Sequence, residues 1–175
     1  MTTEEIKQLI TDWPNRDLIF EHFFQEKDDF DSLLEVACDD SKAVNWRAAW
    51  IIDHLNEQNK SLVAAHLPRI VEAALKSENS SKLRHFLKII SLHPISPNSV
   101  GLLFDRALTI FTTPQYPVAV RVHAMQILYE ISLTEKDLIP ELVQTIENEL
   151  DLHPSAGLKS RGKRILKSLH SKTAS

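Results

Sequence analysis

A short motif that ends in arginine recurs along the chain at nearly constant spacing. It reads Trp46-Arg47, Leu83-Arg84, Val120-Arg121 and Ser160-Arg161, so the arginines lie 37, 37 and 40 residues apart. In each copy an apolar residue follows three or four positions later. A period near 37 fits one helix–turn–helix unit. A single pair of helices cannot bury its apolar face alone, so the repeat predicts helix pairs that stack on one another.

Helical periodicity of the apolar residues extends over nearly the whole chain, and no stretch alternates with period two. Glycine, which tight turns and phosphate-binding loops need, occurs only 3 times. Thr2 and Glu5 form a capping box, Pro68 should kink a helix, and Thr134 is placed as an N-cap. The pattern predicts about ten helices, at residues 3–11, 15–25, 28–38, 42–58, 60–76, 80–92, 98–112, 117–133, 135–152 and 155–169.

The arginine motif resembles that of HEAT/armadillo repeat proteins, in which Arg follows an apolar residue early in the second helix of each pair. Pro68 and Pro140 stand where that family places a proline in the first helix. The likeness covers residues 28–170, although no Asp recurs between the helices at a constant offset, as it usually does in the family. The resemblance implies an all-α fold, a right-handed α-α superhelix of stacked antiparallel helix pairs with four to five units. It also implies a curved surface that binds proteins.

No Gly/Ser-rich linker divides the chain, so one domain is expected over residues 1–170, with a frayed tail at 171–175. The single cysteine, Cys38, allows no intramolecular disulfide, which is typical of a reducing compartment. The N-terminus carries no secretory signal pattern, and the longest apolar run is too short for a membrane span. These features predict a cytoplasmic protein that does not enter membranes.

The patterns that carry chemistry do not occur in the sequence. No two of the 8 histidines are four residues apart, which gives a zinc site little support. The two aspartates after Cys38 would raise the pKa of its thiol, the wrong direction for a nucleophile. The three glycines are isolated, so no phosphate loop is expected. The sequence therefore predicts a non-catalytic protein with no cofactor, no metal and no catalytic residue.

Two groups of residues are candidates for contact with a partner. Trp46 and Trp50 lie four residues apart on one helical face, either as core side chains or as aromatic anchors for a partner. The last predicted helix is strongly basic, although residues 1–60 hold 14 acids against 6 bases. This helix is either a solvated cap of the stack or a site for an acidic partner or a phosphate backbone. Its candidate residues are Lys159, Arg161, Lys163, Arg164 and Lys167.

The favoured function is a protein-interaction scaffold that binds an acidic protein or peptide through its concave surface or its basic C-terminal end. The acidic and basic ends could also meet between copies, in self-association. The alternative is a HEAT-like nucleic-acid-binding protein or DNA glycosylase, which the acidic overall charge of −4 disfavours. Small helical chains of this kind are sometimes labelled adenylosuccinate lyase. That family is longer and carries a Ser-rich catalytic loop, which does not occur here.

Overall fold

A computed structural model describes residues 1–173 of the chain. This part contains eleven α-helices and five short 3-10 turns, and it holds no β-strand, which confirms the predicted all-α fold. Internal contacts divide the chain into two compact units, unit 1 (Met1–His93) and unit 2 (Pro94–Ser175).

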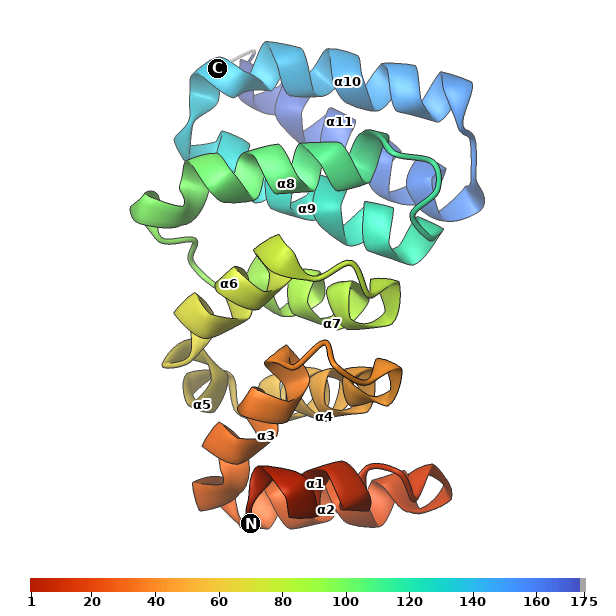
Figure 1. Ribbon diagram of the computed structural model, residues 1–175. Helices are drawn as coiled ribbons and strands as arrows, with labels where there is room; N and C mark the ends of the chain where they lie inside the picture. The colour runs from red at the N-terminus through yellow and green to blue at the C-terminus, as the bar shows by residue number, and fades with distance from the viewer. Residues whose placement is uncertain (174–175) are drawn as a thin grey trace. The chain divides into compact units, whose positions relative to one another are not determined.

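Unit 1 consists of helix pairs in two layers (Figure 1). In the first layer α1 packs on α3 and α3 packs on α6, while in the second α2 packs on α4 and α4 packs on α7. The helices are α1 (Thr3–Leu9), α2 (Arg16–Gln25), α3 (Phe30–Cys38), α4 (Trp46–Gln58), α5 (Lys60–Ala64), α6 (Leu67–Lys76) and α7 (Ser80–Ser91). The short helix α5 connects α4 with α6.

Unit 2 is built from two longer pairs. Helix α9 packs against α8, α10 and α11, and α10 also packs against α11. The helices are α8 (Val100–Thr112), α9 (Val118–Thr134), α10 (Ile139–Leu152) and α11 (Ala156–Thr173). Gly162 lies where α11 crosses α10, and a Cβ there would come within 2.9 Å of Leu150. The absent side chain thus allows the close approach of the two helices.

Each unit has an aliphatic core that follows the predicted helical periodicity. In α3, five of nine residues are buried and the charged residues face outward. Burial of one such side chain contributes about 1.5–3 kcal/mol, so the packed layers rather than intrinsic helix propensity stabilise the fold. Fully buried residues of unit 1 include Ile6, Leu33, Ile51, Leu83 and Phe86, and those of unit 2 include Leu103, Phe111, Met125, Ile146 and Leu158.

Two local predictions differ from the structure, and one is confirmed. The expected helix 60–76 is not merely kinked: it breaks into α5 and α6. In a continuous helix Pro68 would have no N–H to donate to the Ala64 carbonyl, and its ring would clash with that carbonyl. Thr134 is not an N-cap. It ends α9, its hydroxyl donates to the Ile131 carbonyl, and a 3-10 turn precedes α10. The capping box of Thr2 and Glu5 is present as predicted.

The C-terminal end of the chain is longer in helix than expected. Helix α11 continues to Thr173, although the sequence placed the start of a frayed tail at residue 171. The rest of that tail, residues 174–175, lies outside the described residues.

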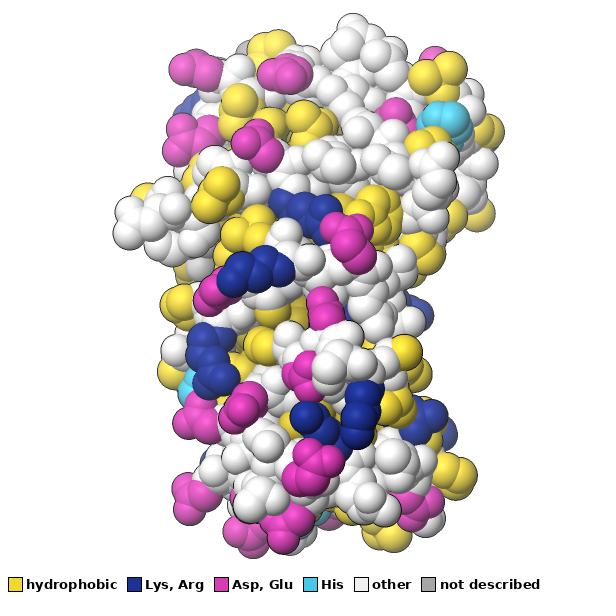
Figure 2. Space-filling view, viewed as in Figure 1, with side chains coloured by type: hydrophobic (Ala, Val, Ile, Leu, Met, Phe, Trp, Pro, Cys, Tyr) yellow, Lys and Arg dark blue, Asp and Glu magenta, His cyan; other side chains and the backbone are white. Residues whose placement is uncertain are grey.

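The face of unit 1 formed by α3 and α6 carries acidic and basic side chains side by side (Figure 2). In the part of the chain described by the structure, no helix combines the length and the apolar character needed to cross a membrane.

Candidate functional site

The three tryptophans of the chain meet on one surface of unit 1. Trp46 and Trp50 lie one turn apart on α4, and both are half-buried. Trp13 comes from the 3-10 turn between α1 and α2 and meets both rings edge to face, with centroids 5.4 Å from Trp46 and 5.1 Å from Trp50. Such edge-to-face pairs are favourable beyond their buried area. Trp46 and Trp50, the two tryptophans predicted as a site, are thus neither fully buried in the core nor fully exposed to solvent.

Further rings extend this cluster across α2. The His54 ring lies 3.8 Å from that of Trp50, and the Phe20 ring lies 6.3 Å from His54. Phe20 stacks on Phe24, which is 42% exposed. We call the resulting chain of ring contacts the aromatic strip, and it comprises Trp13, Phe20, Phe24, Trp46, Trp50 and His54. Sequence spacing alone identified only the two tryptophans on α4.

Arg47 fixes the loop that carries Trp13. Its guanidinium lies 5.1 Å from the Trp13 ring centroid and donates to the carbonyls of Ile10, at 2.9 Å, and Thr11, at 3.2 Å. Both carbonyls lie at the C-terminal end of α1, where a cation is favourable. One side chain of the second helix pair thus holds the loop of the first pair in place.

A buried polar cluster lies beside the aromatic strip, between α4 and α7. Asp53 is only 2% exposed, and its carboxylate lies 2.9 Å from His85 Nδ1 and 3.0 Å from the Lys88 ammonium. Lys88 also pairs with Glu57 at 2.6 Å. Burial raises the pKa of Asp53, but the contacts with His85 and Lys88 outweigh it, so the pKa lies below its ordinary value. The cluster crosslinks the two helices.

His85 joins this cluster to the aromatic strip. Its ring stacks on that of Trp46 at 6.2 Å, with only 9° between the planes. Sequence patterns alone did not identify Asp53, His85 or Lys88. Asp53 lies 32 residues before His85 and 35 residues before Lys88, close to one repeat period. That spacing is the sequence feature that could have indicated their contact.

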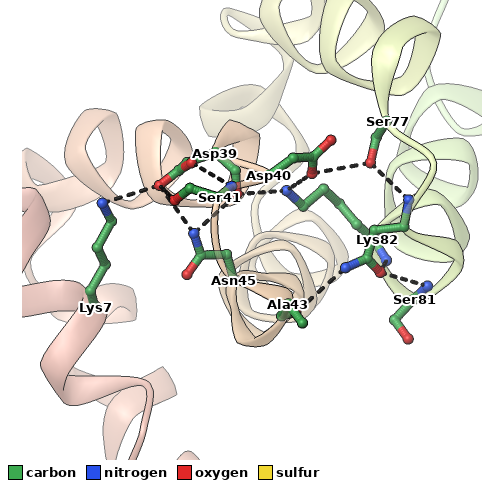
Figure 3. A network of polar contacts seen from close by, with 10 residues as sticks. Lys7, Asp39, Asp40, Ser41, Ala43, Asn45, Ser77, Ser81 and Lys82 are labelled. Carbon is green, nitrogen blue, oxygen red and sulfur yellow. Dashed lines mark hydrogen bonds and ion pairs between the residues drawn. The ribbon is translucent and has the colours of Figure 1, made fainter.

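A second polar network joins three helix pairs of unit 1 (Figure 3). Asp39, just after α3, accepts from the backbone N–H and the hydroxyl of Ser41, both at 2.8 Å, and pairs with Lys7 of α1 at 3.1 Å. These contacts lower the pKa of Asp39 well below its ordinary value. Asp39 therefore lies between α3 and α4, the two helices of one pair, and links them to α1.

Lys82 of α7 completes this network from the next pair. Its fully buried ammonium donates to the Asp39 carbonyl at 3.0 Å and forms an ion pair with Asp40. The Asp40 carboxylate also accepts from Ser77, at 3.2 Å. Lys82 thus acts on α3 as Arg47 acts on α1. The sequence motif had pointed to Arg84, which is exposed.

The other two motif arginines also have different partners. Arg121 is buried, donates to the Phe111 carbonyl at 2.8 Å, and pairs with Glu149 at 2.6 Å. Arg161 is half-buried and donates to Gln126 at 2.5 Å. The spacing of the motif nevertheless reflects the stacking of successive helix pairs, because contacts join residues about one period apart. Arg47 contacts Ile10 across 37 residues, and Arg161 contacts Gln126 across 35.

The five predicted basic residues of α11 do not form one equivalent set. Burial lowers the pKa of Arg161, whose side chain contacts α9. The other four are exposed, and within residues 1–173 no carboxylate forms an ion pair with them. We call these four the basic strip: Lys159, Lys163, Arg164 and Lys167.

Three cations on the second-layer helices of unit 1 bind other parts of the protein, unlike the basic strip. Arg47, Lys82 and Lys88 on the second-layer helices all contact protein oxygens. A nucleic-acid groove would require a basic surface that continues through several repeats, and these engaged side chains do not supply one. Within the described residues, no three His, Cys, Asp or Glu side chains are grouped so that they could hold a metal ion.

Comparison with known proteins agrees with this architecture. A family model described as a HEAT repeat domain matches residues 5–169, which is nearly the whole chain. No curated protein and no solved structure gave a match. Helix pairs, contacts at the repeat period and the family model lead to the same assignment: the chain belongs to the HEAT repeat family.

Proposed function

We propose that this protein is a non-catalytic binding module that docks a segment of another protein on the aromatic strip of unit 1. The observation that carries the proposal is the continuous chain of six partly exposed rings, which includes every tryptophan of the sequence. Tryptophan and arginine dominate the energetics of protein interfaces. HEAT repeats are scaffolds that commonly serve protein interactions.

The rigidity of the strip supports this function. Trp46 rests on the buried His85, and Arg47 holds Trp13 through two backbone carbonyls. A surface whose side chains are already fixed loses little conformational entropy when it binds. Six rings, each in contact with the next, also offer a larger surface for apolar contact than scattered surface residues do. The ligand expected here is a segment that presents apolar side chains.

The basic strip of α11 supports a second contact, with an acidic partner. Four cations with no ion-pair partner among the described residues favour an anionic surface and accelerate its approach. Other exposed cations of the described residues, such as Lys42 and Arg84, also form no ion pair, but the basic strip brings four such cations together on one helix.

Tryptophan fluorescence separates the two surfaces. Trp13, Trp46 and Trp50 all belong to the strip, and unit 2 contains no tryptophan. A partner captured from the source cells at low and high salt and then purified should shift or quench the emission if it docks on the strip. Saturable binding with unchanged emission would contradict this assignment. Nucleic acid that elutes in high salt, without any protein, would favour the nucleic-acid alternative.

A matched pair of variants then locates the contact. Phe24→Glu changes an exposed ring of the strip, whereas Leu102→Glu changes a 66%-exposed side chain of α8 outside it. The first should weaken binding at least about tenfold, the loss typical of a hot-spot residue, and the second should leave it unchanged. Equal dissociation constants for the two variants would sink the proposal. Circular dichroism checks that both remain folded.

A further inference from the structure

The outer side of the last helix pair of unit 2 carries a groove. It lies between α10 and α11 and has a volume of about 680 Å³. Lys159 and Lys163 of the basic strip line it together with Leu150 and Leu166. Glu147 and Asp151 of α10 also line the groove, so α11 alone supplies its basic side. That side, next to the two leucines, is suited to a partner that brings both apolar and acidic side chains.

The first helix pair of unit 1 has a groove of the complementary kind. It lies beside α1 and α2, has a volume of about 480 Å³, and is lined by Leu9, Asp12 and Leu18, among others. Leu18 is 73% exposed, which makes it the most exposed large apolar residue of the described chain. Acidic side chains gather along the edge of unit 1 that α1 and α2 form (Figure 2). This side therefore presents leucines beside Asp12, and the other two ionisable groups of the lining, the Met1 ammonium and His22, are already bound to Asp29.

We infer that the acidic partner of the basic strip is a second copy of this chain, bound through a different surface. The α10–α11 side of one copy would pack against the α1–α2 side of the next. The inference rests on the part of the proposed function that gives the basic strip an acidic partner. It is independent of the aromatic strip.

Charge complementarity selects this occupant. Residues 1–29 carry eight carboxylates and only three basic side chains, whereas residues 139–173, which span α10 and α11, carry six basic side chains, all on α11, and four carboxylates, all on α10. Opposite potentials on the two sides attract unlike surfaces, whereas like surfaces repel each other. The contact joins two different surfaces, so each copy keeps one surface free and a third copy can add unless the ring closes.

The packing within unit 1 provides a precedent for the contact. There, pair stacks on pair, with α1 on α3 and α2 on α4. A neighbouring copy that places α10 and α11 beyond α1 and α2 would continue the same type of helix-layer contact. Leu18 would then be covered by Leu150 and Leu166.

Sedimentation velocity and light scattering over a range of protein concentrations test the inference. The wild-type chain should increase in mean mass with concentration at low salt, and this increase should disappear at high salt. Two charge-reversal variants follow: Lys159→Glu with Lys163→Glu and Lys167→Glu on α11, and Asp12→Lys with Asp17→Lys and Glu21→Lys on the other side. Each should weaken association at least about tenfold when studied alone.

Mixing the two variants is the decisive experiment, because the acidic α11 of one variant can now bind the basic α1–α2 side of the other. The equimolar mixture should associate again, whereas neither variant does so alone. A wild-type chain that stays monomeric at every concentration, or a mixture that stays monomeric, would overturn the inference. The three α11 substitutions lie outside unit 1, so in that variant binding at the aromatic strip should persist. Failure of that binding would concern the proposed function instead.

Discussion

The buried ammonium of Lys82 lies 3.0 Å from the backbone carbonyl of Asp39, at the C-terminal end of α3. The last carbonyls of a helix have no partner within it, and a cation stabilises them and the negative end of the helix dipole. Because Lys82 belongs to α7, this single contact links two successive helix pairs. Arg47 makes the corresponding contact with the end of α1.

Replacement of Lys82 by methionine should destabilise unit 1 by about 1–3 kcal/mol, because the Asp39 carbonyl loses its buried donor. The matched control is Lys76→Met. Lys76 pairs with Glu72 on the surface, and its side chain is 73% exposed, so the loss should stay below about 0.5 kcal/mol. Urea unfolding followed by circular dichroism measures both. Similar midpoints for the two variants would show that the buried contact contributes little.

Replacement of Asp53 by alanine should cost more, about 2–4 kcal/mol, because His85 and Lys88 lose the carboxylate that they share between α4 and α7. Glu57→Ala removes the other carboxylate that pairs with Lys88. The Glu57 side chain is 46% exposed, so this variant should change the free energy of unfolding by less than about 1 kcal/mol. The Trp46 ring stacks on His85, so Asp53→Ala should also alter tryptophan emission in the folded protein. Unchanged emission would mean that the cluster does not position the strip.

The sequence predicted the helices well because each buried face repeats with helical period, as in α3 and α7. It failed where one local feature decides the outcome, as at Pro68, which splits a helix, and at Thr134, which ends one. For the site, the spacing of Trp46 and Trp50 was informative because they share one helix. Trp13 could not be added, since its place depends on how the loop after α1 folds back toward α4. Contacts between elements do not follow from periodicity.

The stability of unit 1 should decrease in mild acid because of His93. This side chain is buried, and its Nε2 lies 2.6 Å from Asn56 Oδ1. Burial, with a smaller contribution from the charge of Lys60, lowers the pKa of His93 below its ordinary value of 6.5. The unfolded chain therefore takes up the proton first, and stability is lost as the pH falls below about 6.5.

Urea unfolding at several pH values between about 8 and about 5 measures this dependence. His93→Gln removes the titrating group and keeps a side chain that can donate to Asn56, so its stability should vary less over this range. A variant whose midpoints follow those of the wild type at every pH would exclude His93 as the source.

The contact of α11 with α10 depends on the missing side chain of Gly162. A Cβ at this position would lie 2.9 Å from Leu150 Cδ1 and 3.3 Å from Ile146 Cγ2, so either the Leu150 side chain would have to shift or the two helices would have to move apart. Gly101 is the matched control, because it also lies in a helix, α8, but a Cβ there would meet no atom within 4 Å. Gly162 lies inside α11, where valine has a better helix propensity than glycine, whereas Gly101 lies in the first turn of α8, where propensity matters less. A net loss of stability at Gly162 therefore reports the packing. Gly162→Val should destabilise unit 2 by about 1–3 kcal/mol, whereas Gly101→Val should change stability by about 0.5 kcal/mol or less. Thermal unfolding with equal midpoints for the two variants would mean that Leu150 moves aside without cost.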